Sequence, residues 1–216
     1  MDDNILLTIA IITAVVVIGI ILMLATTYRK AALGEVLVRT GLGGPVIFFS
    51  GGLVYPVLHL LERMDITQKS VVLKRERHDG MICKDYLRAD IQVRFLIRVG
   101  QTEKDILQVA NTVGVERASD LQQLQLLFDN KFSEALKTAG REFEFEELVQ
   151  HTDRFVERIL AEIGADLGGY VINACEVIHL ELTDIKYLDE NNLMDAEGIK
   201  KLIGLKAARQ VEPKTD

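Results

Sequence analysis

The chain opens with an unbroken apolar run from Ile5 to Ala25, in which two threonines are the only polar residues. A helix crosses about 30 Å of hydrocarbon with roughly 20 apolar residues, and this run has 21. A signal peptide would carry a shorter apolar region with basic residues ahead of it, whereas Asp2 and Asp3 precede this run. The pattern therefore predicts a permanent transmembrane helix over residues 5–27, after a short tail at residues 1–4.

The residues that follow this run have the properties of a membrane boundary. Tyr28 suits the interface between lipid and water, and Arg29 and Lys30 are basic. Basic flanks of a membrane span stay in the cytoplasm. The sequence therefore predicts a single-pass protein with its N-terminus outside and its body in the cytoplasm.

A second apolar run, GGPVIFFSGGLVYPVLHLLERM, occupies residues 43–64. The Ser50-Gly51-Gly52 turn signal and Pro56 interrupt it, which argues against a second span because a helix here would be costly. Two interpretations remain. In the first, two strands joined by the Ser-Gly-Gly turn are buried in the domain core. In the second, a membrane-proximal apolar hairpin dips its exposed tip into the adjacent leaflet, and the membrane-contact residues are Val46, Ile47, Phe48, Phe49, Leu53, Val54 and Tyr55.

The clearest alternation of apolar and polar positions is in YLRADIQVRFLIRV, residues 86–99. Apolar side chains occupy every second position from Leu87 to Val99, and Leu96 alone breaks the pattern. This period predicts a long strand with one dry and one wet face. By default the wet face meets water. The alternative is that it pairs with a neighbouring subunit through Arg88, Asp90, Arg94 and Arg98.

Shorter signals predict further strands. EVLVRTG, residues 35–41, is one candidate strand. Asp79-Gly80 lies between two β-prone runs and can supply the positive φ values that a tight hairpin turn needs. YVINACEVIHLELTDI, residues 170–185, is rich in β-branched residues and predicts a last strand.

Helical periodicity separates the long strand from the last one. Helix starts are predicted at Thr102-x-x-Asp105 and Ser119-x-x-Gln122, where a hydroxyl can accept from first-turn amides. One helix is expected from Asp120 to about Gly140 and another from Glu144 to about Leu167. The fold class is therefore α+β, an antiparallel sheet with packed helices. It forms a body at residues 28–190, and residues 191–216 begin a C-terminal helical region.

Composition and motifs argue against several functional classes. The formal net charge is −7, which offers no basic field for a phosphate backbone, so nucleic acid is not an expected partner. Cys83 and Cys175 lie far apart without a C-x-x-C motif, as expected of free thiols in a reducing compartment. The four histidines lack the spacing of metal ligands. GLGG at residues 41–44 lacks the lysine of a phosphate loop. We expect no catalytic residue, no metal and no cofactor.

Four separated segments follow the N-terminal span in a fixed order. They read EVLVRTGLGGPVIFFSGGLVYPVLHLLERMDI, VVLKRERHDGMICKDYLRADIQVRFLIRV, LKTAGREFEFEELVQHTDRFVERI and LTDIKYLDENNLMDAEGIKKL. Together they resemble the bacterial flotillin branch of the SPFH (stomatin/prohibitin/flotillin, or band 7) superfamily. The resemblance covers nearly everything from Tyr28 to about Leu202. It rests on the order of the segments, because no single motif is diagnostic.

The resemblance implies an α+β SPFH domain carried on the bacterial inner membrane, without enzymatic activity. Family members assemble into large rings or cages that enclose or organise patches of lipid and protein. The implied partners are membrane lipids, further copies of the chain and an NfeD-type membrane protein. Two alternatives stay open. One is a regulatory adaptor of a membrane protease, as related SPFH members are, and the other is a membrane-tethered enzyme, which would need a pocket with converging ionisable groups.

The sequence departs from the family pattern after Gly198, where IKKLIGLKAARQVEPKTD follows. The family pattern has a long Ala/Glu-rich coiled coil there. Stable coiled coils need several heptads, and this segment has none. We therefore expect either a truncated form or a protein that assembles through its body alone.

Overall fold

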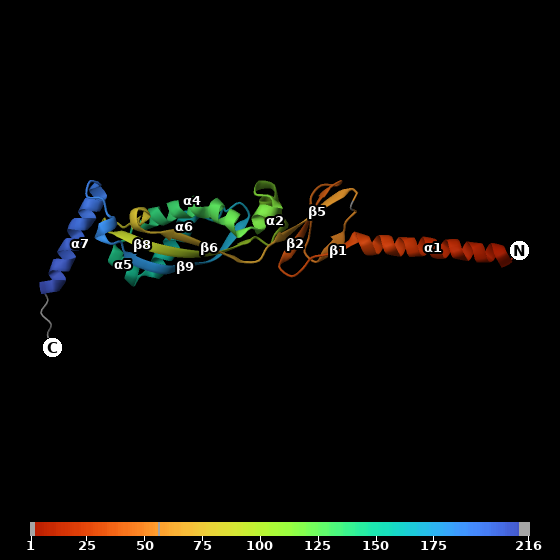
Figure 1. Cartoon of the computed structure of the whole chain (residues 1–216), viewed down its shortest axis with the longest axis horizontal. Coiled ribbons are helices and arrows are strands. Elements are labelled where there is room, and N and C mark those ends of the chain that lie inside the picture. The colour runs from red at the N-terminus through yellow and green to blue at the C-terminus, as the bar shows by residue number, and fades with distance from the viewer. Residues whose placement is uncertain (1–2, 56, 212–216) are drawn as a thin grey trace, which may run out of the picture. The chain divides into compact units, whose positions relative to one another are not determined.

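The computed structural model describes residues 3–55 and 57–211 (Figure 1). Its first element is helix α1, Asp3–Thr27, whose side chains between Leu7 and Met23 are exposed. Residues Leu7–Thr27 are long and apolar enough to cross a membrane. The helix predicted over this apolar run is therefore confirmed.

The chain divides into two compact units, and the first comprises residues 1–67 and 101–119. Its central strand pairs antiparallel with one strand on each side, and a second, separate strand pair lies in the same unit. The three-stranded sheet consists of β2, Glu35–Gly41, between β3, Val46–Phe48, and β5, His59–Asp65. The separate pair consists of β1, Tyr28–Lys30, and β4, Gly51–Leu53. The strand predicted at EVLVRTG is thus confirmed as β2.

Two helices complete the first unit: α2, Glu103–Thr112, and α3, Val115–Ser119. α2 starts as predicted, because the hydroxyl of Thr102 accepts from the backbone N–H of Asp105. α3 packs on β5, where the backbone N–H of Asp65 donates to Ser119 Oγ over 3.1 Å. The buried core of this unit contains Val36, Leu37, Val38, Met64, Ile106 and Val109.

The second unit comprises residues 68–100 and 120–216 and has its own antiparallel sheet. Its central strand is the long predicted one, β8, Arg88–Val99. One side of β8 pairs with β9, Tyr170–Leu182, and the other with β6, Lys69–Arg75, and β7, Met81–Ile82. Along β8 buried and half-buried positions alternate from Ala89 onward, which confirms the predicted dry and wet faces there.

Helices pack on the dry face of this sheet (Figure 1). The ring of Phe132 lies 4.2 Å from that of Phe95 on β8 and 5.1 Å from that of Phe128, measured between centroids. The helices of the unit are α4, Leu121–Gly140, α5, Phe145–Gln150, α6, Thr152–Ile163, and α7, Leu193–Val211. Two short 3-10 turns lie at Arg77–Asp79 and Ile185–Tyr187. The α+β class is therefore confirmed.

The hairpin turn predicted at Asp79-Gly80 is wrong. β6 pairs directly with β8, and the positive φ values in this region belong to Arg77, at 56°, and Tyr86, at 64°, which lies in the turn between β7 and β8. Gly80 ends the 3-10 turn at Arg77–Asp79, where its N–H donates to the carbonyl of Arg77, and it also packs closely, because a Cβ on it would lie 3.0 Å from the carbonyl oxygen of Ala89.

The single helix predicted from Glu144 to about Leu167 is also wrong, because this segment holds two helices. His151, with φ −128° and ψ 49°, separates α5 from α6. Gly164, with φ 75°, ends α6 early. The start of α4 shifts by one residue, since the carboxylate of Asp120, and not the hydroxyl of Ser119, caps its first turn.

Candidate membrane-contact surface

Strands β1 and β4 hold part of the second apolar run beside the C-terminal end of α1. Tyr28 pairs with Leu53 in the register of this two-stranded sheet. The backbone N–H of Val54 donates to the carbonyl of Thr27, the last residue of α1, over 2.9 Å. Because these contacts join backbone atoms, they hold residues 51–54 beside the C-terminal end of α1.

The residues predicted to contact lipid differ in exposure. Three are exposed, at 47%, 43% and 39%: Phe49, Leu53 and Tyr55. Two are half-buried: Val46 and Phe48. Two are buried, at 8% and 4% exposure: Ile47 and Val54. The expectation that Ile47 and Val54 face lipid is therefore corrected, because their side chains lie in the core of the first unit.

The hairpin predicted within residues 43–64 does not form. β3 pairs with β2 and β4 pairs with β1, so the two apolar pieces belong to different sheets. The glycines between them allow close packing, since a Cβ on Gly52 would lie 2.5 Å from the ring of Phe48. Neither open interpretation of the run is therefore complete: part of the run is buried as strands and part is exposed.

Sequence reasoning missed four exposed apolar side chains in the same unit. Their exposed fractions are 74%, 95%, 54% and 62% for Leu42, Val57, Leu58 and Leu60. The backbone N–H of Leu42 donates to the carbonyl of Leu58, which brings the loop between β2 and β3 close to the end of the loop between β4 and β5. The signal in the sequence was the apolar stretch VLHLL that follows Tyr55-Pro56. We use the name apolar loops for the exposed apolar residues of this region, which are Leu42, Leu53, Tyr55, Val57, Leu58 and Leu60.

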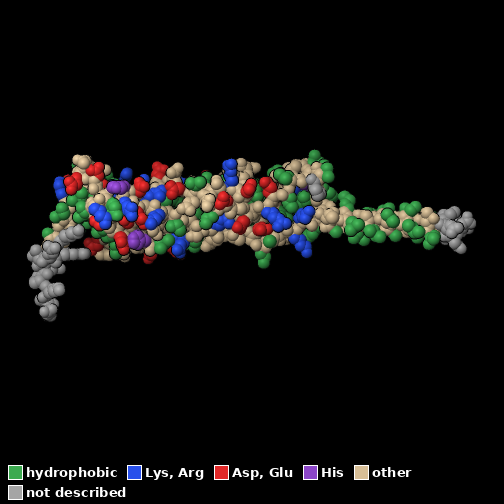
Figure 2. All heavy atoms as spheres, in the orientation of Figure 1, with side chains coloured by type: hydrophobic (Ala, Val, Ile, Leu, Met, Phe, Trp, Pro, Cys, Tyr) green, Lys and Arg blue, Asp and Glu red, His purple; other side chains and the backbone are tan. Residues whose placement is uncertain are grey.

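Positive charge accompanies the apolar loops. The predicted boundary residues Tyr28, Arg29 and Lys30 are exposed and form β1. Between residues 4 and 61 the sequence holds three bases, the third being Arg39, and a single acid, Glu35. Figure 2 shows Lys and Arg side chains beside hydrophobic ones over this part of the first unit. An anionic lipid surface would be attracted to such a combination.

The wet face of β8, the other predicted site, is largely occupied by partners within the second unit. Arg98 Nε donates to Asn173 Oδ1 on β9 over 3.1 Å, and Asp90 Oδ1 accepts from the backbone N–H of Arg77 over 2.8 Å. Arg94 has a more open environment, because its side chain is 42% exposed and lies 3.5 Å from the half-exposed carboxylate of Glu176. Contact of Asp90, Arg94 or Arg98 with a neighbouring subunit stays a prediction.

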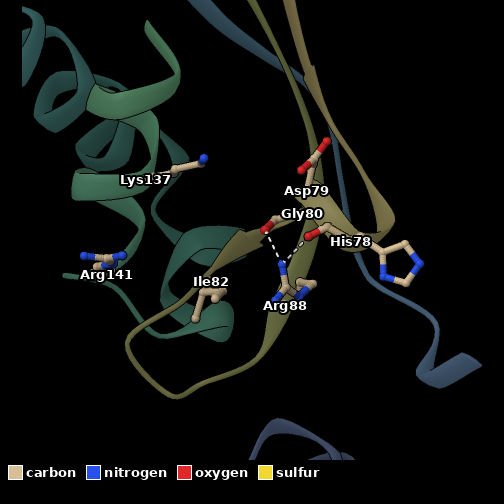
Figure 3. A pocket seen from close by; sticks show the side chains of 7 residues that line it. All are labelled: His78, Asp79, Gly80, Ile82, Arg88, Lys137 and Arg141. Atoms are coloured by element: carbon tan, nitrogen blue, oxygen red, sulfur yellow. Dashed lines mark hydrogen bonds between the residues drawn. The ribbon is translucent and has the colours of Figure 1, made fainter. Parts of the chain in front are cut away.

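Arg88 does not face water, so its predicted place on the wet face is wrong. It is 8% exposed, and its Nε and one terminal nitrogen donate to Asp195 Oδ1 over 3.1 and 2.7 Å. The other terminal nitrogen donates to the carbonyls of His78 and Gly80 over 2.8 and 3.0 Å (Figure 3). Arg88 is buried because α7, which carries Asp195, covers the beginning of β8.

Further contacts hold α7 on the turn between β7 and β8. Gly198 approaches this turn so closely that a Cβ on it would lie 2.5 Å from the carbonyl oxygen of Tyr86. Lys201 Nζ lies 2.8 Å from Asp85 Oδ2, and the side chain of Leu202 is buried. The beginning of the C-terminal helix is thus packed against the sheet of the second unit.

Several side chains capable of chemistry line one hollow of the second unit, among the residues that the structure describes. Within those residues no three His, Cys, Asp or Glu side chains are grouped so that they could hold a metal ion. Cys83 and Cys175 are free, and burial raises the pKa of Cys83 to about 12. The hollow in Figure 3 has a volume of about 190 Å³, and Lys137 of α4 and Arg141, which directly follows α4, contribute to its lining. Its lining residues include no serine, threonine or cysteine. Five of its lining residues are ionisable, as the alternative of a membrane-tethered enzyme would require: His78, Asp79, Arg88, Lys137 and Arg141.

Comparison with known proteins places this architecture among membrane proteins. A family model described as SPFH domain / Band 7 family matches residues 30–209. The chain is 31% identical over 189 residues to the flotillin family inner membrane protein YqiK of Escherichia coli (strain K12). It is 26% identical over 199 residues to the flotillin family inner membrane protein sll1021 of Synechocystis sp. (strain ATCC 27184 / PCC 6803 / Kazusa). Each match covers 86% of this chain, but 34% and 29% of the two relatives, so the chain spans about a third of their length.

Proposed function

Because the chain belongs to the SPFH / Band 7 family, we propose that it is a non-catalytic scaffold protein of the bacterial inner membrane. Helix α1 anchors each copy, and the apolar loops rest in the adjacent leaflet. Many copies assemble laterally into a ring or cage that organises or encloses a patch of membrane. The partners are lipids and further copies, with an NfeD-type membrane protein as a third candidate.

The backbone pairing of β1 with β4 is the observation that carries this proposal. It holds the exposed side chains of Leu53 and Tyr55 beside the end of α1, and the neighbouring loops expose Leu42, Val57 and Leu58. Transfer of apolar surface out of water is favourable by roughly 25 cal/mol per Å². Apolar loops next to a membrane anchor therefore gain free energy when they enter the leaflet at that end of the anchor.

The proposed orientation follows from charge. Asp2 and Asp3 precede the anchor and Arg29 and Lys30 follow it, and basic flanks stay on the cytoplasmic side. The two relatives named above are inner membrane proteins by name. We therefore place the N-terminus of this chain outside and both compact units in the cytoplasm.

Membrane confinement supports the proposed assembly. Copies anchored in one bilayer have a high effective concentration, so modest interfaces repeated between neighbours suffice. A head-to-tail contact closes into a ring when its rotation allows closure. Arg94 and Glu176, which are half-exposed on the wet face of the second sheet, are our candidates for charges that set the register between neighbours.

Tryptophan fluorescence tests the membrane contact, because the chain contains no tryptophan. We would place a single probe by Val57→Trp and, as a matched control, by Leu33→Trp, since these apolar residues are 95% and 103% exposed in the same unit. The control lies beyond β1, which leads away from Thr27. In nanodiscs that contain lipids with brominated acyl chains, we expect strong quenching of the probe at position 57 and weak quenching at position 33. Equal quenching, or none at position 57, would exclude the proposed contact.

Particle imaging tests the assembly. The full chain would be extracted with a polymer that retains native lipid, and its particle mass and shape would be measured by single-particle electron microscopy. Closed rings or domes of many copies, with lipid inside, are expected. Monomers or dimers at every lipid-to-protein ratio would contradict the scaffold. Charge reversal by Arg94→Glu would then show whether this residue contributes, because an unchanged particle size would remove it from the interface.

A further inference from the structure

Three basic side chains of the first unit lie where its apolar loops meet the anchor, and we propose that they bind the phosphate of an anionic phospholipid. Arg39 is the central ligand in this proposal, and Arg29 and Lys30 support it. The inference rests on the proposed membrane contact and specifies which lipid headgroup the contact selects.

The guanidinium of Arg39 lies among residues of the apolar loops and their strands. One terminal nitrogen donates to the carbonyl of Leu53 over 3.1 Å, and the guanidinium carbon lies 5.3 Å from the centroid of the Phe48 ring. In the sheet, Arg39 pairs with Val46 on one side and Leu61 on the other. The positive charge is therefore held two residues from the loop at residues 41–44.

Arg39 has hydrogen-bonding capacity that the described part of the chain does not use. Its Nε is buried and has no hydrogen-bond partner there. A buried donor without an acceptor is costly. None of the ion pairs found among the described residues includes Arg39. A phosphate oxygen that reaches this nitrogen would remove the cost and neutralise the charge.

Arg29 and Lys30 extend the positive charge along β1. Both are exposed, and their register partners on β4 are Gly52 and Gly51, which have no side chains to oppose them. Of the nearby acids, Glu35 lies at the opposite end of β2 from residues 40–41, and Glu62 on β5 lies opposite Val38, the residue before Arg39. Residues 28–61 thus hold three bases and one acid in a chain whose net charge is −7.

The chemistry of the site favours a phospholipid over an acidic protein segment. A guanidinium binds phosphate through two parallel hydrogen bonds, and its neighbours Leu53 and Tyr55 are exposed apolar side chains suited to an acyl chain. One molecule that carries a phosphate beside hydrocarbon fits both features. An acidic peptide would satisfy the charges but would leave the apolar side chains in water.

Headgroup-selective quenching tests the proposal on the full chain that carries Val57→Trp. Nanodiscs would contain phosphatidylcholine and phosphatidylglycerol in a constant ratio, so that the bilayer charge does not change. In one sample the phosphatidylglycerol carries brominated chains, and in the other an equal amount of phosphatidylcholine does. Each membrane-proximal cation attracts anionic lipid by about 1 kcal/mol, so quenching by phosphatidylglycerol should exceed that by phosphatidylcholine by roughly fivefold.

Substitutions identify the residues that are responsible for the preference for phosphatidylglycerol over phosphatidylcholine. Arg39→Gln should at least halve the ratio of the two quenching efficiencies, and Arg39→Lys should restore part of it because the charge returns. The pair Arg29→Gln and Lys30→Gln alters exposed side chains and should also lower the ratio, even if Arg39→Gln impairs folding. Arg117→Gln is the matched control, since Arg117 is exposed on α3 of the same unit, and it should leave the ratio unchanged.

The outcomes separate this inference from the membrane contact on which it rests. A ratio near one in the unsubstituted background, with strong quenching by both lipids, would overturn phosphate binding and leave the contact intact. Equal loss in Arg39→Gln and Arg117→Gln would also overturn it, because the effect would then be one of net charge. Absence of quenching by either lipid would overturn the contact itself.

Discussion

The buried pair between Arg88 and Asp195 holds α7 against the second sheet, and Asp195→Asn removes the negative charge with little change of shape. The two side chains are 9% and 6% exposed, so water screens the pair weakly. Two guanidinium N–H groups donate to the same carboxylate oxygen. The substitution leaves Arg88 as a buried cation without a counter-charge, and breaking a pair of this kind costs about 3–5 kcal/mol.

Hydrogen exchange measured by mass spectrometry on the full chain in nanodiscs would locate this loss. If the amides of α7 exchange when the helix leaves the sheet, a cost of 3–5 kcal/mol accelerates their exchange by roughly 150- to 4,000-fold. Helix α4 should respond less, because it is held by the buried side chain of Phe132 and its neighbours.

Two further variants should accelerate exchange in α7 less than Asp195→Asn does. Lys201→Met breaks the pair with Asp85, in which the lysine is 39% and the carboxylate 6% exposed. Because the backbone N–H groups of Leu87 and Phe145 still donate to this carboxylate, the loss should be smaller than that caused by Asp195→Asn. The combination Arg88→Met with Asp195→Leu replaces the charged pair by apolar side chains, which is often close to neutral. Its α7 exchange should approach that of the unsubstituted chain. Exchange within threefold of the unsubstituted chain in Asp195→Asn would refute the reasoning from burial.

Three other predictions follow from packing and burial. Gly198→Ala should accelerate exchange in α7, because the new Cβ would lie 2.5 Å from the carbonyl oxygen of Tyr86; unchanged exchange would show that the helix can shift without cost. Cys83 and Cys175 should react slowly with a thiol reagent at pH 8, since burial raises the pKa of each to about 12 and the thiolate is the reactive form. Urea should accelerate both reactions, and fast reaction without urea would contradict the prediction. Phe132→Ala should lower the free energy of unfolding by about 3–5 kcal/mol, because the ring is fully buried; urea denaturation followed by circular dichroism measures this, and a loss below 1 kcal/mol would contradict it.

The elements that the sequence predicts well are those in which one hydrophobic pattern continues along the whole element and its surroundings stay the same. β8 is buried at Ile91, Val93 and Phe95 and half-buried at the positions between them, because helices pack on one face of its sheet. In α1 the whole circumference is apolar, so its helical length could be predicted without knowing a partner. Hydrophobicity alone carries enough information in both cases.

Boundaries between elements were predicted less well, because one or two residues decide them. The buried positions Leu148 and Phe155 lie seven apart and continue a helical period across His151. Periodicity therefore joined α5 and α6 into a single helix. The break depends on the backbone angles of His151, which a hydrophobic pattern does not contain.

The errors in the candidate site have a shared cause, which is pairing between segments that lie far apart in the chain. Val54 and Val57 are apolar residues of one run, yet Val54 is 4% and Val57 95% exposed. The difference arises because the backbone of Val54 pairs with Thr27 at the end of α1, whereas Val57 lies in the loop beyond this pairing. Arg88 became buried for the same reason, since its partner Asp195 is 107 residues away. The local sequence pattern shows which residues are hydrophobic, but it does not show which distant residue each of them will contact. The exposure of each side chain in this run is therefore determined by the strand pairing of the first unit, and hydrophobicity along the run is insufficient to assign it.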